Sequence, residues 1–353
     1  MKIVKSGSQP LDDIDDFQVI KSLAGSQNWD TPTRVGIGHD YAAKVRVKYL
    51  DRVLSFVDVA HLKPLRIVMN SGSGAAGPTV DAIIERLKRQ DAPIEFIRVH
   101  HEPDNTFLNG IPNPFLEKNH KVTTDVVLRE KANFGVAFDG DFDRCFFFDD
   151  AGQFVPGKYV VGLLGAIFLE KEEGSKIIHG PRVTWNTQDI VTRKGGDAVQ
   201  SKTGHAFIKQ AMREHRAIYG GEMSAHHYFC DFAYCDSGMI PWLLVAELVS
   251  KSGRSVADWV HDRFEAFPSS GEINFLVEDA GASIDRVLSA YRDQAVSLDE
   301  MDGVSLAFED WRFNLRRSNT EPLVRLNIKS CGGAQGLRAK ISDISKLLGG
   351  TVA

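Results

Sequence analysis

Residues 65–90 read LRIVMNSGSGAAGPTVDAIIERLKRQ and indicate the fold class. The apolar run at 65–70 is typical of a buried strand, and a glycine-rich turn leads from it into the helical pattern of 79–90. Two further strand patterns follow, PIEFIRVH at 93–100 and FGVAFDGD at 134–141. Alternation of strands and helices at these lengths predicts a parallel sheet with flanking helices.

A second unit with the same order of elements follows between residues 154 and 267. Its strand and helix patterns alternate, at 176–181, 185–196, 198–202, 205–215 and 217–224. After residue 267, runs of strands with flanking helices predict a smaller α+β domain.

The fold prediction is therefore α/β, with mixed-sheet α/β domains at 41–153 and 154–267 and a smaller α+β domain at 268–353. A chain of 353 residues is too long for one ordinary core, which agrees with several domains. A short strand is predicted at 2–5, but residues 1–40 contain little that can form a core. We interpret them as the end of a larger unit.

The composition excludes several classes of function. A net charge of −5 lacks the clustered basic excess that is typical of nucleic-acid binding. There is no apolar run of about 18 residues for a membrane span, and the N-terminus lacks the apolar core of a signal peptide. The cysteines form no CxxC pair, which favours buried thiols in a reducing compartment over disulfides or zinc. We expect a cytoplasmic globular protein.

Three aspartates, Asp139, Asp141 and Asp143, follow a predicted strand. Side chains at the carboxyl end of a parallel strand point into the crevice where α/β proteins bind ligands. Three converging carboxylates repel one another unless a cation neutralises them, and all-oxygen ligation suits Mg²⁺. The pattern predicts a magnesium site. The alternative is a solvated acidic turn, which the apolar flanks GVAF and RCFFF disfavour.

Two other metal motifs contain aspartates at a similar spacing. An EF-hand needs glycine at its sixth position and glutamate at its twelfth, and counting from Asp139 these positions hold Arg144 and Asp150. The EF-hand is therefore excluded. The DxD motif of a metal-dependent glycosyltransferase remains an alternative.

A GxGxxG pattern occurs at 72–77, between a strand and a helix, as in dinucleotide-binding sites. No acidic residue stands at the tip of the next strand, where such a site needs one. Pro78 opens the helix, which suits a tight turn equally well. We interpret the glycines as structural.

The run YGGEMSAHHYF at 219–229 predicts a polar loop at the end of a strand. Glu222 and Ser224 can hydrogen-bond sugar hydroxyls there. The alternative is a turn whose histidines are surface groups or zinc ligands. Because neighbouring side chains of an extended chain point to opposite sides, we do not expect His226 and His227 to ligate one metal together.

The run FNLRRSNTEPLVR at 313–325 places Arg316 and Arg325 around polar donors. These donors are Ser318, Asn319 and Thr320. Arginine forks combined with hydroxyl and backbone donors are typical of phosphate binding. The alternative, an exposed basic turn, does not need a polar run between two apolar strands.

His205 heads a predicted helix, after Lys202, Thr203 and Gly204. Amides at a helix N-terminus attract anions, and histidine can act as a general acid or base near neutral pH. The alternative is a structural histidine.

Together, DGDFDR, GEMSAHH and RRSNTEPLVR, in this order, resemble the motifs of the α-D-phosphohexomutase family, most closely those of its bacterial phosphomannomutases. The pieces IVMNSGSGAAGP and NGIPNP strengthen the resemblance, which covers essentially the whole chain. It implies four domains around a deep cleft, each contributing one loop.

The resemblance also implies roles for individual residues. Asp139, Asp141 and Asp143 correspond to the Mg²⁺ ligands, with Arg144 completing that catalytic loop. The residues that correspond to the sugar-specificity loop are Glu222, Ser224 and His226. Those that correspond to the loop that holds the substrate phosphate are Arg316, Ser318, Asn319, Thr320 and Arg325. His205 is the candidate acid or base.

The implied reaction interconverts mannose 6-phosphate and mannose 1-phosphate, or the glucose phosphates, through a sugar bisphosphate. A phosphoserine gives its phosphoryl group to the substrate and then recovers the other one, while the metal offsets the charge of the transferring group. In the family this serine lies in a T-A-S-H-N-P type loop of the first domain. The present sequence contains no such run, and Ser71 and Ser73 do not match it.

Because MKIV resembles the strand after that loop, residues 1–40 are expected to be a remnant of the first domain. We then expect the 353-residue chain to be inactive alone. One hypothesis is a phosphomannomutase whose start is truncated or wrongly assigned. The other is a Mg²⁺-dependent phosphosugar-binding module, acting as a sensor or pairing with a separately encoded first domain.

Overall fold

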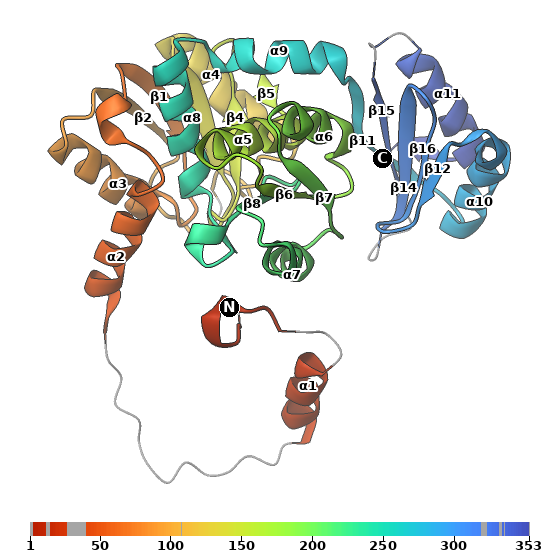
Figure 1. The fold of residues 1–353 in the computed structure, drawn as a ribbon, viewed down its shortest axis with the longest axis horizontal. Helices are drawn as coiled ribbons and strands as arrows, with labels where there is room; N and C mark the ends of the chain where they lie inside the picture. The colour runs from red at the N-terminus through yellow and green to blue at the C-terminus, as the bar shows by residue number, and fades with distance from the viewer. Residues whose placement is uncertain are drawn as a thin grey trace.

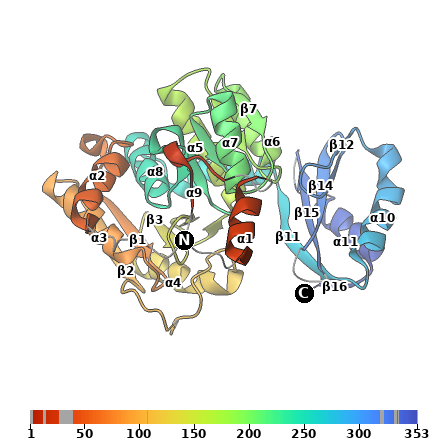
Figure 2. The ribbon, with the colours of Figure 1, turned by 90° about the horizontal axis from the view of Figure 1, so that it is seen from below.

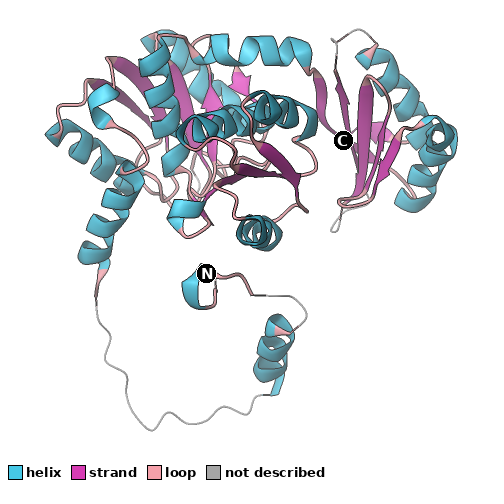
Figure 3. Ribbon diagram, in the orientation of Figure 1, coloured by secondary structure: helices cyan, strands magenta, loops and turns pink. Residues whose placement is uncertain are grey.

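The computed structural model describes residues 3–11, 15–26, 40–106, 108–318, 323–331, 334 and 336–352. Within these residues the strands form three sheets, which follow one another along the chain (Figure 1). Figure 3 shows helices packed against each sheet, so every sheet has at least one covered face.

The first sheet has the strand order β2-β1-β3-β4-β5. Its strands are β1 (Leu65–Asn70), β2 (Ile94–Val99), β3 (Phe134–Phe138), β4 (Cys145–Phe148) and β5 (Phe154–Val155). β1 pairs in parallel with β2 and β3, whereas β4 is antiparallel to β3. The associated helices are α2 (Ala42–Leu54), α3 (Gly77–Arg89) and α4 (His120–Glu130), with 3₁₀ turns η2 (Val59–His61) and η3 (Glu117–Asn119).

The second sheet repeats this pattern in the order β10-β9-β8-β6-β7. Its strands are β6 (Lys176–His179), β7 (Asp197–Gln200), β8 (Tyr219–Gly221), β9 (His227–Phe229) and β10 (Cys235–Asp236). β6 is parallel to β7 and β8, and β9 is antiparallel to β8. The helices are α5 (Gly157–Lys171), α6 (Thr184–Arg193), α7 (His205–His215), α8 (Met239–Ser252) and α9 (Val256–Ala266), with the 3₁₀ turn η4 (Cys230–Phe232).

The third sheet is antiparallel throughout, in the order β12-β13-β14-β15-β11-β16. Its strands are β11 (Ser269–Leu276), β12 (Ser297–Asp299), β13 (Val304–Ala307), β14 (Trp311–Arg317), β15 (Leu323–Ser330) and β16 (Thr351–Val352). Two helices, α10 (Ala280–Tyr291) and α11 (Leu337–Leu348), cover one face, and the 3₁₀ turn η5 (Arg292–Gln294) follows α10. The predicted fold class, two mixed α/β units followed by a smaller α+β unit, is confirmed.

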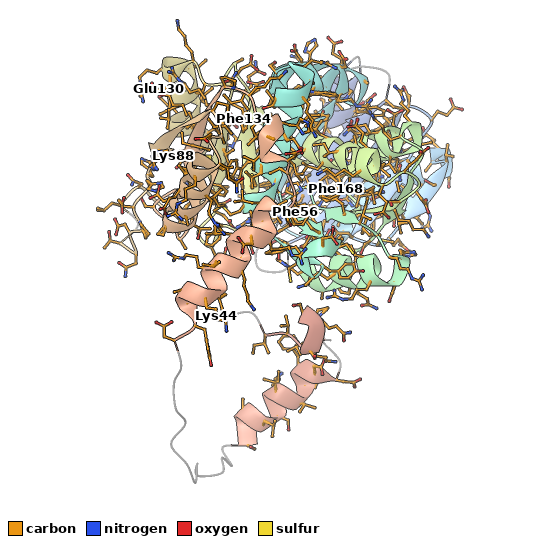
Figure 4. The ribbon with its side chains drawn as sticks, turned by 60° about the vertical axis from the view of Figure 1, so that its left-hand side comes forward. Lys44, Phe56, Lys88, Glu130, Phe134 and Phe168 are labelled. Carbon is orange, nitrogen blue, oxygen red and sulfur yellow. The ribbon has the colours of Figure 1, made fainter. Side chains whose placement is uncertain are left out.

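The first two sheets share one apolar core, and we call residues 40–267 the body. Phe56 connects its halves, because its ring contacts Phe168 of α5 and Phe229 of β9, with centroids 6.5 and 5.3 Å away. In Figure 4 Phe56 and Phe168 lie inside the body, whereas Lys44 and Lys88 project from its surface. Helices α5 and α8 are apolar on nearly all sides because both are buried within this core.

Residues 268–352, which we call the C-terminal unit, have a separate core that includes Phe275, Phe313 and Leu326. Figure 2 shows this unit beside the body, with β11 on the side that faces it. The two halves of the molecule therefore fold around different sets of apolar side chains.

The N-terminal segment differs from the prediction. No strand forms in residues 3–5, where only an isolated bridge joins Val4 to Pro10. A lone extended segment has no neighbouring strand to complete its hydrogen bonds. A helix, α1 (Asp16–Ser26), follows the 3₁₀ turn η1 (Ser6–Ser8), and none of its residues is buried.

The helices of the described part of the chain are all too short or too polar to traverse a lipid bilayer.

Candidate functional site

The three aspartates lie together in the loop after β3, as the sequence predicts. One carboxylate oxygen from each of Asp139, Asp141 and Asp143 falls within 4.8 Å of the others. Asp139 is 1% exposed, whereas Asp141 is exposed and Asp143 is partly exposed. We call these three residues the aspartate triad. The triad therefore reaches from the core of the body to its surface.

Arg144 closes this loop onto its first aspartate. Its backbone N–H and its Nε donate to the two carboxylate oxygens of Asp139, at 3.2 and 2.6 Å. Burial raises the pKa of Asp139 to about 6, although the positive charge of Arg144 acts in the opposite direction. A buried carboxylate next to two others favours a further cation, and the all-oxygen donor set fits Mg²⁺.

Two glycine-containing turns hold the metal loop by its backbone. Ala75 N–H donates to Gly140 C=O at 2.9 Å, and Gly238 N–H donates to Phe142 C=O at 3.2 Å. A Cβ added to Gly238 would lie 2.6 Å from the carbonyl oxygen of Phe142, so only glycine permits this approach. The 72–77 turn thus packs against the metal loop, which agrees with the structural interpretation of its glycines.

The predicted sugar loop lies directly beside the metal loop. Arg144 and His226 form an isolated antiparallel bridge, and Cys145 N–H donates to Ala225 C=O at 3.3 Å. Ser224 is partly exposed in this loop. Glu222 is 3% exposed and accepts hydrogen bonds from Tyr228 Oη at 2.6 Å and Gly204 N–H at 3.0 Å.

The adjacent histidines point apart, as expected from extended chain. His226 Nδ1 lies 3.1 Å from Asp236 Oδ2. His227 is fully buried on the other side, with its Nδ1 2.6 Å from the hydroxyl of Tyr219, and burial lowers its pKa to about 3. Only His226 faces the metal loop.

His205, the first residue of α7, joins the same group. Its Nδ1 lies 3.2 Å from Asp236 Oδ2, the atom that also faces His226. The two imidazole rings meet edge to face, with centroids 4.4 Å apart. His226 Nδ1 is in turn 3.7 Å from Asp143 Oδ1 of the aspartate triad. The candidate acid or base therefore lies near the metal loop.

The predicted phosphate turn lies in the C-terminal unit. Arg316 and Arg325 are cross-strand partners on β14 and β15. Glu272 lies between them, 4.0 Å from Arg316 Nη2 and 3.5 Å from Arg325 Nη1. Burial and the neighbouring Arg182 lower the pKa of Arg316. Asn319 and Thr320 lie outside the described residues, and Ser318 N–H donates to Leu323 C=O at 2.9 Å.

The segment at 203–205 connects all three loops. Thr203 Oγ1 donates to Asp302 Oδ2 at 2.8 Å, and Asp302 Oδ1 is 3.8 Å from Arg316 Nη1 of the phosphate turn. The next residue, Gly204, donates to Glu222 of the sugar loop, and His205 faces Asp236. Polar contacts, together with the backbone of 203–205, thus connect the guanidinium group of Arg316 to the aspartate triad.

Comparisons with known proteins agree with this arrangement. Residues 47–152 match the description "phosphoglucomutase/phosphomannomutase, alpha/beta/alpha domain II", and residues 156–267 match domain III of the same series. The chain is 52% identical over 348 residues to a phosphomannomutase of Salmonella montevideo, covering 99% of this chain and 76% of that protein. It is 50% identical over 348 residues to a phosphomannomutase of Escherichia coli K12, with the same coverage.

The chain belongs to the phosphoglucomutase/phosphomannomutase family. Its fold also matches a solved phosphoglucomutase/phosphomannomutase family protein of Burkholderia thailandensis, with a TM-score of 0.79 and 25% identity, covering 98% of this chain and 73% of that one. The recognised resemblance is therefore confirmed. The family assignment leaves the glycosyltransferase alternative without support.

Sequence reasoning missed four charged residues of the candidate site. Asp236 faces both histidines, and Arg182, Glu272 and Asp302 surround the arginines of the phosphate turn. Asp236 directly follows the run 228–235, half of whose residues are aromatic, a signal that single-sequence reading could have used. The sequences around Arg182, Glu272 and Asp302 show no such signal. These residues come together only because the C-terminal unit packs against the body.

Proposed function

We propose that this chain holds a hexose phosphate and Mg²⁺ for a phosphomannomutase-type reaction. The reaction interconverts mannose 6-phosphate and mannose 1-phosphate through a sugar bisphosphate. The observation that supports it is the series of contacts from Arg316 through Thr203 and His205 to the aspartate triad. The series links the candidate phosphate site to the candidate metal site.

The phosphate would bind between Arg316 and Arg325. Among the described residues, the buried Nε atoms of Arg325 and Arg182 have no hydrogen-bond acceptor, so donors remain for phosphate oxygens. Glu272 now supplies the negative charge between these guanidinium groups. A phosphate group brings more negative charge and a matching bidentate geometry.

Mg²⁺ would be held by Asp139, Asp141 and Asp143, and when bound it offsets the negative charge of the transferring phosphoryl group. Arg144 keeps Asp139 oriented through its two hydrogen bonds. His205 and His226 face one carboxylate, that of Asp236, which orients both imidazoles, and His205 is the candidate acid or base. Glu222 and Ser224 would contact the sugar hydroxyls.

The covalent step needs a phosphoserine, and the 353 residues contain no run of the T-A-S-H-N-P type. We therefore propose that this chain alone binds substrate without turnover, because positioning without a nucleophile cannot complete the transfer. Conversion of mannose 6-phosphate to mannose 1-phosphate, measured with added sugar bisphosphate, tests this. Turnover by the 353-residue chain comparable to that of a full-length family member would contradict it.

A phosphoserine domain is the partner that this proposal requires. Helix α1 exposes Phe17, Val19, Ile20 and Leu23, so the N-terminal segment offers an apolar surface on which such a domain can pack. Turnover that appears when the first domain of a related phosphomannomutase is added would support this role. Without such complementation, the chain remains a phosphosugar-binding module.

Binding is tested by calorimetry with mannose 1-phosphate and Mg²⁺. We expect heat from the parent chain and a loss of affinity of at least about tenfold in Arg316→Ala, since charged hydrogen bonds of this kind contribute about 1.5–3 kcal/mol. The matched control is Arg317→Ala, which removes the exposed arginine next in sequence. No heat in the parent chain, or equal losses in both variants, would contradict the proposal. Titration with glucose 1-phosphate then compares the two sugars.

A further inference from the structure

A second group of possible metal ligands lies beside the aspartate triad. Asp143, His205, His226 and Asp236 each offer one ligand atom, and these four atoms lie within 4.8 Å of one another. We call them the histidine–aspartate cluster. It shares Asp143 with the triad but draws its other members from α7, the sugar loop and β10.

Three donor distances within this cluster are close to those of a tetrahedral site. Donor atoms about 2.0–2.1 Å from a central zinc ion stand roughly 3.3 Å apart at tetrahedral angles. Asp236 Oδ2 lies 3.2 Å from His205 Nδ1 and 3.1 Å from His226 Nδ1, and His226 Nδ1 lies 3.7 Å from Asp143 Oδ1. Small side-chain movements would place all four around one ion.

The chemistry of the donors differs from that of the triad. Two imidazole nitrogens and two carboxylate oxygens suit Zn²⁺, whereas Mg²⁺ prefers oxygen ligands alone. The two carboxylates also balance the charge of one divalent ion when both imidazoles are neutral. We propose that the histidine–aspartate cluster is a Zn²⁺ site that overlaps the candidate mutase site, because it shares Asp143 with the triad and uses His205 and His226.

The backbone holds the ligands in place before an ion arrives. His226 is bridged to Arg144, the residue after Asp143, so these two ligands are fixed relative to each other. His205 is partly exposed at the start of α7, with 38% of its side chain accessible. An ion can therefore enter from solvent past His205, while Asp236, 7% exposed, forms the floor.

Sharing Asp143 couples the two sites. A Zn²⁺ ion that binds Asp143 Oδ1 competes with the triad for this carboxylate and adds a like charge beside it. By thermodynamic reciprocity, an ion in the triad weakens the cluster by the same factor.

The test uses Co²⁺ as a coloured probe for Zn²⁺ on the metal-free 353-residue chain. We expect the visible absorption bands of four-coordinate Co²⁺ at one equivalent, and their loss when Zn²⁺ displaces it, because Zn²⁺ binds such sites more tightly. Exchangeable, paramagnetically shifted N–H proton signals from two imidazoles should appear in the NMR spectrum of the same sample. That measurement needs no variant.

Isosteric variants locate the ion. His205→Gln and Asp236→Asn should each weaken Co²⁺ binding by at least about tenfold, as loss of even an outer-shell partner does. Asp141→Asn, which alters only the triad, should leave it unchanged. The proposal is overturned if no four-coordinate bands or imidazole signals appear, or if Asp141→Asn weakens binding and His205→Gln does not. Strong near-ultraviolet thiolate bands, which would indicate cysteine ligands, would also overturn it.

Discussion

The body and the C-terminal unit hold their parts of the site in different ways. In the body, two sheets share one apolar core, and turns such as the one at Gly238 hold the metal loop by backbone contacts. The C-terminal unit has its own core. Side-chain pairs join it to the body, among them Arg182–Glu272 at 2.9 Å and Thr203–Asp302 at 2.8 Å.

This difference indicates how each half responds to a ligand. Packed backbone cannot move without leaving a clash or a cavity, so the metal loop is a fixed platform. Charged side-chain contacts can exchange partners, and a cavity of about 620 Å³ separates Tyr159 and Phe264 of the body from Glu272 and Asn327 of the C-terminal unit. We expect the phosphate turn to adjust its position relative to the metal loop.

The largest effect is expected at Glu272, the acid between three arginines. Glu272→Gln leaves Arg182, Arg316 and Arg325 without that charge, and breaking a largely buried pair costs about 3 kcal/mol. Denaturant unfolding should show this loss mainly in the C-terminal unit. Glu278→Gln, an exposed acid close in sequence, is the control. If the two variants have equal free energies of unfolding, the negative charge of Glu272 does not stabilise the arginine cluster.

Gly238→Ala tests whether backbone packing holds the metal loop of the body in place. The added Cβ would lie 2.6 and 2.7 Å from the carbonyl oxygens of Phe142 and Arg144, so we expect a loss of about 2 kcal/mol and a displaced metal loop. Thermal unfolding and Mg²⁺ titration measure the two effects. In Gly25→Ala the added methyl meets nothing within 4 Å, and stability should not fall. If Gly238→Ala changes neither the thermal stability nor Mg²⁺ binding, the metal loop is not held by its backbone contacts.

Lys158 gives a pH-dependent test of the boundary between the halves. It is 7% exposed on α5, and burial lowers its pKa to about 7 from 10.5. Between these pH values the unfolded chain binds a proton that the folded chain does not, so stability rises with pH by up to about 1.4 kcal/mol per unit. Urea unfolding at several pH values within this window measures the free energy of unfolding. In Lys158→Met, the rise of this free energy with pH that is due to Lys158 should be absent. Parallel slopes for parent and variant would contradict it.

The smallest effect is expected at the helix that leads into the C-terminal unit. Ser255 and Asp258 form a capping box at the start of α9, and Ser255→Ala removes one of its two hydrogen bonds. The expected loss is about 1 kcal/mol in thermal unfolding of the body. If the midpoint of thermal unfolding does not change, the capping box does not contribute to the stability of the body.

The sequence predicted most of the regular elements and the aspartate triad, because both depend on local patterns. The apolar strands β1, β2 and β3 have strand length and helical neighbours, and the triad follows a strand end. The helix α5 was not predicted from the sequence. Asp236 and Glu272 acquire their roles only when distant segments pack together, which a single sequence does not record.

Thr203 couples the position of the C-terminal unit to the orientation of His205. It is tied to Asp302 of the C-terminal unit, and the first residue of α7, His205, comes only two positions later. A shift of the third sheet that keeps this tie intact would tilt the imidazole against Asp236. The chemical shift of the His205 ring would then report the position of the C-terminal unit relative to the body.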